Sequence, residues 1–232
     1  MAGLKACAAH VTHEAGLKAC ATCATLMAMF AVASAAAVAQ PCSTLVLRSV
    51  EGRALRTGFR AASSQIRVEA PEGGEVDPLN TPAGVKAIVF LFTSTDCPIS
   101  NRYAPEVRRL VMRFAPQGVL FKLVYPNPAD DRRAILEHMG AFAYAGATQA
   151  LRDPKHALVK FTGVTVTPEA AIYAGGRVVY HGRIDDRYVD LGLERPAARA
   201  HDLADALTAV VAGQPVKQPV TQAVGCYIAD FR

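Results

Sequence analysis

The sequence predicts an α/β fold in which helices cover both faces of a mixed central sheet. Residues 85–92 and 119–125 are apolar runs, each with a single lysine, which are typical of strands buried on both faces. Between them, residues 104–114 place apolar side chains on one helical face and arginines on the other. Residues 169–173 and 177–181 flank a Gly-Gly turn, which predicts a β-hairpin. Parallel strands joined by a helix, followed by an antiparallel hairpin, give a mixed sheet.

Three further helices are expected over residues 130–144, 153–161 and 202–212. The first begins with an acidic pair at Asp130, which suits the first turn of a helix. The second has Pro154 in its first turn, where no N–H donor is needed. The predicted order is therefore strand, cysteine loop, helix, strand, two helices, hairpin and helix.

Composition excludes several classes of protein. The chain of 232 residues is 51% hydrophobic and 19% charged, values that exclude a disordered chain and allow one ordinary domain with appendages. Its net charge of +5 is mild, and its basic residues are scattered rather than interleaved with aromatic residues. We therefore expect no nucleic-acid partner.

The N-terminal segment, residues 1–39, is predicted to be a signal peptide. Residues 24–39 carry no charge and end in Ala37-Val38-Ala39, small residues of the kind that a signal peptidase recognises, and Lys18 supplies the positive charge upstream. The protein is therefore expected to be exported, to the periplasm or out of the cell. The alternative is an uncleaved membrane anchor, which the alanine-rich composition disfavours.

The remainder of the chain is expected to have three parts. Residues 40–72 form an N-terminal extension, residues 73–213 the main domain and residues 214–232 a C-terminal tail. The turn sequence Pro71-Glu72-Gly73-Gly74 marks the start of the main domain. The tail contains Cys226 and is too short to fold alone.

Cleavage of the leader would leave three of the six cysteines, namely Cys42, Cys97 and Cys226. In an oxidising compartment thiols pair or serve redox chemistry, and an odd number leaves at least one of them free or transiently paired. The count therefore favours a reactive cysteine.

Cys97 is the strongest candidate for that thiol. It follows a predicted buried strand and precedes a helix, whose N-terminal N–H groups and dipole lower the pKa of a nearby thiol. Ser100 lies in the first turn of this helix, where its hydroxyl and backbone N–H can face the sulfur. The alternative, an inert structural cysteine, is disfavoured by the polar neighbours Asp96 and Asn101.

A second signal is Thr167-Pro168, at the start of the first hairpin strand. Proline at a strand start is an unusual placement, and the peptide bond before it can be cis. Glu169, the next residue, is a candidate for influencing proton transfer at the sulfur.

Together these segments resemble the thioredoxin superfamily. The run FLFTSTDCPISNRYAPE is similar to its strand, active-site loop and first helix, and FTGVTVTPEAAIYAGGRVVYHGRIDDR has Pro168 in the place of its cis-proline. The resemblance covers residues 75–213 and extends to secreted bacterial redoxins of the alkyl hydroperoxide reductase/thiol-specific antioxidant (AhpC/TSA) family. It implies a thioredoxin-like fold, Cys97 as catalytic nucleophile, and a substrate site at Thr167, Pro168 and Glu169.

Departures from the family patterns bear on mechanism. Ser100 replaces the second cysteine of C-x-x-C, so Cys97 lacks the usual neighbouring thiol that would release a mixed disulfide. In the peroxiredoxin pattern P-x-x-x-T-x-x-C, Ser94 keeps the hydroxyl but Phe90 replaces the proline. Asn101 replaces the second cysteine of the copper-delivery pattern C-x-x-x-C, and the histidines lack ligand spacing. We therefore expect neither a metal site nor a cofactor.

Cys226 is a candidate for the missing partner of Cys97. Gly225 frees the backbone before it, and nearby apolar residues allow the tail to dock on the domain, which would make Cys226 a resolving thiol. The alternatives are a structural disulfide between Cys42 and Cys226, or two free thiols.

Three functions remain open. The first is an exported thiol-disulfide oxidoreductase, a reductase or isomerase in which Cys97 of the CPIS loop attacks a protein disulfide and Cys226 or an external thiol reductant resolves it. The second is an AhpC/TSA-type peroxidase, in which peroxide oxidises Cys97 to a sulfenic acid that condenses with Cys226. The third is a non-catalytic binding module. Ser100 and Phe90 favour the first over the second, and a reactive cysteine argues against the third.

We expect the exported protein to begin at Gln40, because the uncharged segment ends there in a small-x-small site. Mass spectrometry of the N-terminal peptide of the secreted protein measures this directly. A chain that starts upstream of residue 24 would contradict the predicted cleavage.

Overall fold

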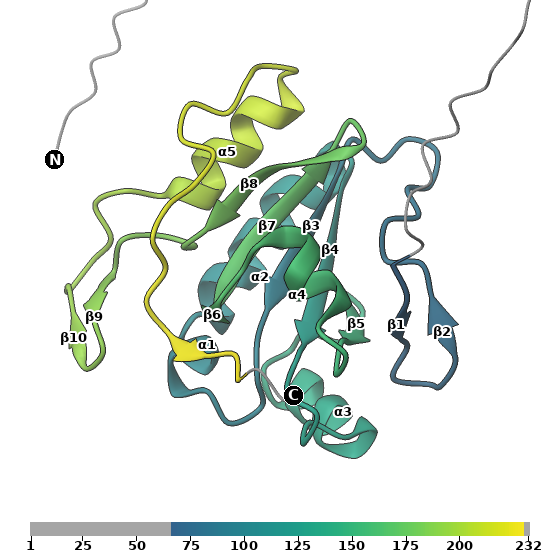
Figure 1. Cartoon of the computed structure of the whole chain (residues 1–232). Helices are drawn as coiled ribbons and strands as arrows, with labels where there is room; N and C mark the ends of the chain where they lie inside the picture. The colour runs from purple at the N-terminus through teal and green to yellow at the C-terminus, as the bar shows by residue number, and fades with distance from the viewer. Residues whose placement is uncertain (1–65, 230–232) are drawn as a thin grey trace, which may run out of the picture. The chain divides into compact units, whose positions relative to one another are not determined.

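The computed structural model describes residues 66–229, so the predicted leader and most of the predicted extension lie outside it (Figure 1). The main sheet has the spatial order β2-β1-β5-β4-β3-β7-β8. Its strands are β1 (Val68–Glu69), β2 (Glu75–Val76), β3 (Ala87–Phe92), β4 (Val119–Tyr125), β5 (Gln149–Arg152), β7 (Glu169–Ala174) and β8 (Arg177–Gly182). Strands β3, β4 and β5 run parallel, whereas β7 and β8 are antiparallel to their neighbours, so the sheet is mixed as predicted.

Five α-helices accompany the sheet within the described residues. They are α1 (Pro98–Arg102), α2 (Ala104–Phe114), α3 (Arg132–Ala141), α4 (Ala157–Thr162) and α5 (Asp202–Val211), and a 3₁₀ turn, η1 (Ala115–Gln117), follows α2. Two small sheets pair β9 (Tyr188–Asp190) with β10 (Leu193–Glu194) and β6 (Val166–Thr167) with β11 (Cys226–Tyr227). None of these helices is long and apolar enough to span a membrane.

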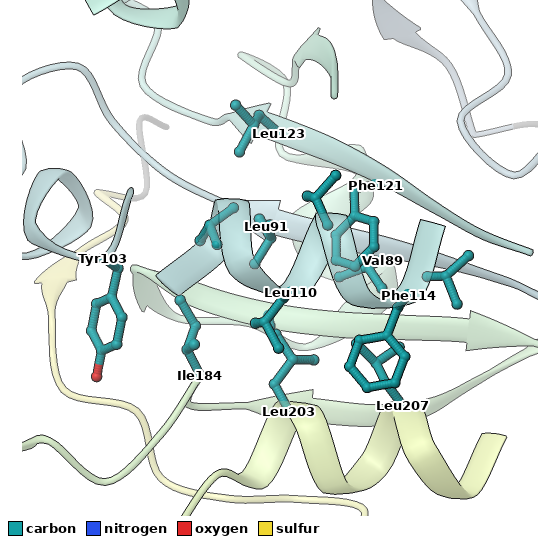
Figure 2. Packing of buried hydrophobic residues seen from close by; sticks show 14 of the residues in the cluster. Val89, Leu91, Tyr103, Leu110, Phe114, Phe121, Leu123, Ile184, Leu203 and Leu207 are labelled. Carbon is teal, nitrogen blue, oxygen red and sulfur yellow. The ribbon is translucent and has the colours of Figure 1, made fainter. Parts of the chain in front are cut away.

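The larger core includes buried residues of α2, α3 and α5. Figure 2 shows α2 and α5 packed over one face of the sheet. Successive strand residues point to opposite faces, so Val89 and Leu91 of β3 face this side. Leu110 of α2 and Leu203 of α5 pack over them, each no more than 3% exposed. Burial of each such side chain contributes roughly 1.5–3 kcal/mol relative to exposure.

The opposite face is covered by α4. Ile88 and Phe90 of β3 are fully buried there, together with Leu158 of α4. Helices therefore lie on both faces of the sheet, which confirms the predicted arrangement. The central strands β3 and β4 are buried on both sides, and this explains why their sequences are apolar except for Lys122.

The predicted start and end of α3 were wrong. The helix begins at Arg132, after Asp131, whose carboxylate accepts the N–H of Ala134 at 2.8 Å as an N-cap. It ends at Ala141 rather than at residue 144, because Ala143 adopts a left-handed conformation with φ of 54°.

The predicted start of α4 was also wrong. His156 has φ of 55°, so the helix starts at Ala157, and Pro154 precedes it rather than occupying its first turn. The Asp153 carboxylate instead accepts the first backbone N–H groups of the helix, including that of Ala157 at 2.8 Å.

Two strands change the outline of the sheet. Strand β5, whose four residues mix polar and apolar types, was not predicted. Strand β1 belongs to the predicted N-terminal extension, and it pairs with β5 as part of the main sheet.

Candidate active site

Cys97 lies between β3 and α1 and is the N-cap residue of α1. Pro98 follows at the first helical position, which needs no N–H donor. The N–H of Asn101 donates to the Cys97 carbonyl at 3.1 Å. The side chain of Cys97 is directed into the protein, and the residue is only 1% exposed.

The Thr167–Pro168 peptide bond, which is cis, lies against this cysteine. The Cys97 thiol donates to the Thr167 carbonyl oxygen at 3.1 Å. The two signals that the sequence analysis singled out are therefore brought together, although seventy residues separate them in the chain.

Glu169, the third predicted residue of this segment, has different contacts. Its carboxylate accepts the backbone N–H groups of Thr165 at 2.8 Å and Val166 at 3.3 Å, and lies 3.4 Å from Nδ1 of His181. Among the described residues, Glu169 makes no hydrogen bond with Cys97. Its contacts hold β6 in position ahead of Pro168.

Cys226 reaches Cys97 through strand β11, which pairs antiparallel with β6 so that Cys226 lies opposite Thr167 (Figure 1). The two Sγ atoms are 3.0 Å apart and both thiols are free. A covalent S–S bond measures about 2.05 Å, so this contact joins two thiols, one of which can donate to the other. Cys42, the other partner considered for Cys226, lies outside the described residues.

The tail follows β8 before it reaches the site. The N–H of His181 donates to the Pro219 carbonyl at 2.9 Å, and the His181 carbonyl accepts the N–H of Thr221 at 3.2 Å. The Thr221 hydroxyl lies 2.7 Å from the hydroxyl of Tyr180. A Cβ at Gly182 would lie 2.3 Å from the side-chain oxygen of Thr221, so this close contact requires glycine.

A second glycine lets the tail lie directly on the active site. A Cβ at Gly225 would lie 2.2 Å from the Thr167 carbonyl oxygen, far inside van der Waals contact. Beyond it, the N–H of Ile228 donates to the Thr165 carbonyl at 3.0 Å. Val224 packs against the core under α2 and α5, and Ile228 packs against the core under α4. The tail is therefore anchored to both cores, one on each side of Cys226.

The surroundings of Cys97 favour its thiolate. Burial raises the pKa of Cys97, but the nearby side chains of Cys226, Ser100 and Thr167 and the backbone N–H of Ser100 lower it by more. The net shift of this pKa is downward from the ordinary value of 9.0. The Ser100 hydroxyl is buried and has no other partner within residues 66–229, so it is available to the sulfur.

Cys226 is shifted in the opposite direction. Burial, the hydrogen bond with Cys97, and the negative charges of Cys97 and Asp96 raise the pKa of Cys226 to about 12. Cys97 therefore ionises first, while Cys226 keeps its proton and can donate it to the Cys97 sulfur.

Buried polar groups hold the loop that carries Cys97. Asp130 is 2% exposed and accepts the hydroxyl groups of Ser94 at 3.1 Å and Thr95 at 2.5 Å. Asp130 was predicted to start a helix, but Asp131 is the N-cap of that helix. Because a helix needs only one N-cap, the second of two adjacent acidic residues was the sign that Asp130 has another role.

A cavity of about 200 Å³ is lined by Cys97 and Cys226, and Asp96, Asn127 and Tyr227 also line it. Larger cavities lie beside α5, at about 680 Å³, and against Lys122, at about 610 Å³, but neither borders a cysteine. Within residues 66–229 no three His, Cys, Asp or Glu side chains are grouped so that they could hold a metal ion.

These elements define a thioredoxin-like fold. The mixed sheet, with its parallel pair β3-β4 and antiparallel pair β7-β8, has helices on both faces. A cysteine at the N-terminus of a helix faces a cis-proline across the site.

Comparison with solved structures finds the same fold in proteins of distant sequence. A hypothetical protein from Sinorhizobium meliloti has a TM-score of 0.58 and 23% identity, over 70% of this chain and 88% of that one. An uncharacterized conserved protein from Geobacillus kaustophilus has a TM-score of 0.58 and 23% identity, over 72% and 90%. A secreted disulfide oxidoreductase from Mycobacterium tuberculosis has a TM-score of 0.44 and 17% identity, over 64% and 96%, a similarity too low to add to the assignment. No protein-family model matches the sequence, and no curated protein is significantly similar to it.

The opposite pKa shifts predict a pH titration of the reduced protein. Thiolate absorbance near 240 nm should rise below pH 9 as Cys97 ionises, and Cys97→Ser should abolish this component. Cys226 should contribute nothing in that range, because its pKa is about 12. If Cys226→Ser removes the low-pH component and Cys97→Ser leaves it, the roles of the two thiols are reversed.

We expect Gly225→Ala to displace the tail, because the new methyl group would overlap the Thr167 carbonyl. Alkylation of Cys97 by iodoacetamide, followed by peptide mapping, should be at least tenfold faster than in the natural protein. Gly140→Ala is the matched control, since a Cβ there has no atom within 4 Å. Equal alkylation rates in the two variants would show that the tail does not shield Cys97.

Proposed function

We propose that this protein is an exported thiol-disulfide oxidoreductase in which Cys97 is the nucleophile and Cys226 is its resolving thiol. The observation that carries the proposal is the 3.0 Å contact between the two Sγ atoms. Cys226 would thereby replace the second cysteine of a C-x-x-C motif, whose position in the CPIS loop is occupied by Ser100. The export step is inferred from the leader sequence.

The proposed reaction has two exchanges. The Cys97 thiolate attacks one sulfur of a protein disulfide and expels the other as a thiolate, which leaves a mixed disulfide on Cys97. Cys226 then loses its proton and attacks the Cys97 sulfur, so that the Cys97–Cys226 disulfide forms and the substrate leaves as a dithiol. Two electrons pass from the cysteine pair to the substrate, and an external thiol must return them.

Substrate is proposed to bind beside Pro168, along Thr167. In the structure this edge is paired with the tail, and Cys226 lies opposite Thr167. A protein disulfide therefore has to displace β11 to reach Cys97. The lowered pKa of Cys97 and its contact with Cys226 favour a catalytic role over that of a non-catalytic binding module.

A thiol peroxidase is the second candidate, because the cavity beside Cys97 has the size of a small molecule. Peroxide would oxidise the Cys97 thiolate to a sulfenic acid and leave as water or an alcohol, and Cys226 would condense with it to release water. The Ser94 hydroxyl argues against this function, because it lies 2.5 Å from Asp96 and 3.1 Å from Asp130. Both carboxylates are hydrogen-bond acceptors and compete with a peroxide for its single proton.

The test compares single-cysteine variants with a disulfide-containing protein such as insulin. Cys226→Ser should accumulate a mixed disulfide between Cys97 and the substrate, visible by mass spectrometry, because the step that releases it is lost. Cys97→Ser should form no such adduct. The natural protein should instead accumulate the Cys97–Cys226 disulfide and release reduced substrate.

Cys42→Ser is the control, since it removes a cysteine without touching this pair and should leave turnover unchanged. A Cys42–Cys226 cross-link with Cys97 free would refute the resolving role of Cys226. Formation of the Cys97–Cys226 disulfide with stoichiometric hydrogen peroxide, but not with insulin, would favour the peroxidase.

A further inference from the structure

Cys97 and Cys226 differ in exposure, and the residue with the lower pKa is the less exposed. Cys97, which has the lowered pKa, is 1% exposed under the tail, where Gly225 lies against Thr167. Cys226 is only half-buried and is followed by Tyr227, which is 83% exposed. An external reagent therefore meets Cys226 before it meets Cys97 as long as the tail is in place.

We propose that an external thiol which reduces the Cys97–Cys226 disulfide attacks Cys226 and expels Cys97. This inference rests on the proposed function, because it requires the disulfide to form. The reductant would then first bond to a sulfur of the tail and not to the sulfur of the CPIS loop.

The chemistry balances with two equivalents of thiol. A thiolate RS⁻ attacks Sγ of Cys226, an R–S–S–Cys226 bond forms, the Cys97–Cys226 bond breaks, and Cys97 leaves as a thiolate. A second RS⁻ attacks the R sulfur, releases Cys226 as a thiolate that takes up a proton, and leaves as RSSR. The reductant loses two electrons, and the protein disulfide gains them.

Leaving-group chemistry supports the same direction. Exchange is faster when the departing sulfur has the lower pKa, and the environment of Cys97 lowers its pKa whereas that of Cys226 raises its own. Ser100 remains beside Cys97 to stabilise the departing thiolate. Attack on Cys97 would instead expel the Cys226 thiolate, which has the higher pKa and is the poorer leaving group, and would require the reductant to reach the less accessible cysteine.

The charge near Cys226 also selects the class of reductant. Asp96 is exposed and lines the cavity beside Cys97 and Cys226. Its negative charge contributes to the raised pKa of Cys226. An approaching anionic thiol is therefore repelled, and a cationic thiol is attracted. The fitting reductant is a thiol whose sulfur is flanked by neutral or positive groups.

The position of attack can be read from the intermediate. The oxidised natural protein is mixed with 2-mercaptoethanol, quenched with acid at millisecond intervals, alkylated with N-ethylmaleimide at mildly acidic pH and mapped by mass spectrometry. We expect mercaptoethanol on Cys226 and maleimide on Cys97 in the same molecule. Mercaptoethanol on Cys97 with maleimide on Cys226 would overturn the inference.

The charge selection is tested with three thiols of similar size. Cysteamine, 2-mercaptoethanol and 3-mercaptopropionate are compared at equal thiolate concentration, and the rates should fall in that order, by roughly twofold to fivefold per charge. Asp96→Asn should reduce the differences in rate among the three thiols, and 0.5 M salt should reduce them in the natural protein. A series that is flat, or that Asp96→Asn leaves unchanged, would refute the role of Asp96.

Failure of this inference is distinguishable from failure of the proposed function. If the natural protein never forms a Cys97–Cys226 disulfide, the proposed function fails. If the disulfide forms but the reductant is found on Cys97, only the entry point is wrong.

Discussion

The active site depends on the close contact between the backbone of Gly225 and the carbonyl of Thr167. Only a residue without a side chain can lie so near to that oxygen, and the pairing of β11 with β6 follows from it. This pairing places Cys226 against Cys97 and covers Cys97 from solvent. One backbone approach therefore places a second thiol beside Cys97, limits access to Cys97 and establishes the different environments of the two cysteines.

Those environments replace what a C-x-x-C motif provides within four residues. Ser100 cannot form a disulfide, but its buried hydroxyl and backbone N–H stabilise the thiolate of Cys97. The second thiol comes from the C-terminal tail, 129 residues further along the chain. Because Cys226 lowers the pKa of Cys97 and is also the proposed resolving thiol, movement of the tail changes the acidity of Cys97 and the proposed resolution together.

The parts of the fold that could be predicted from the sequence are those in which burial alone determines the residue types. Strands β3 and β4 are apolar except for Lys122 because both faces are buried, so their bounds were predicted closely. Strand β5 mixes residue types and was missed. Asp130 was assigned with Asp131 to the first turn of a helix, because two adjacent acidic residues do not show which of them is buried below a loop. The contact of Cys226 with Cys97 was only one of several alternatives, because long-range pairing depends on tertiary structure.

A disulfide between such distant positions couples redox state to the docking of the tail. Closing a loop of this length removes roughly 4–5 kcal/mol of chain entropy from the unfolded state in the loop-entropy account. In the oxidised protein the tail is held both by this bond and by its contacts with the two cores. Reduction leaves only the non-covalent contacts, and local opening of a terminal segment then costs less than global unfolding. In the proposed reaction Cys97 of the reduced protein must meet a large substrate, and the reduced protein is also the form in which β11 separates most readily from β6.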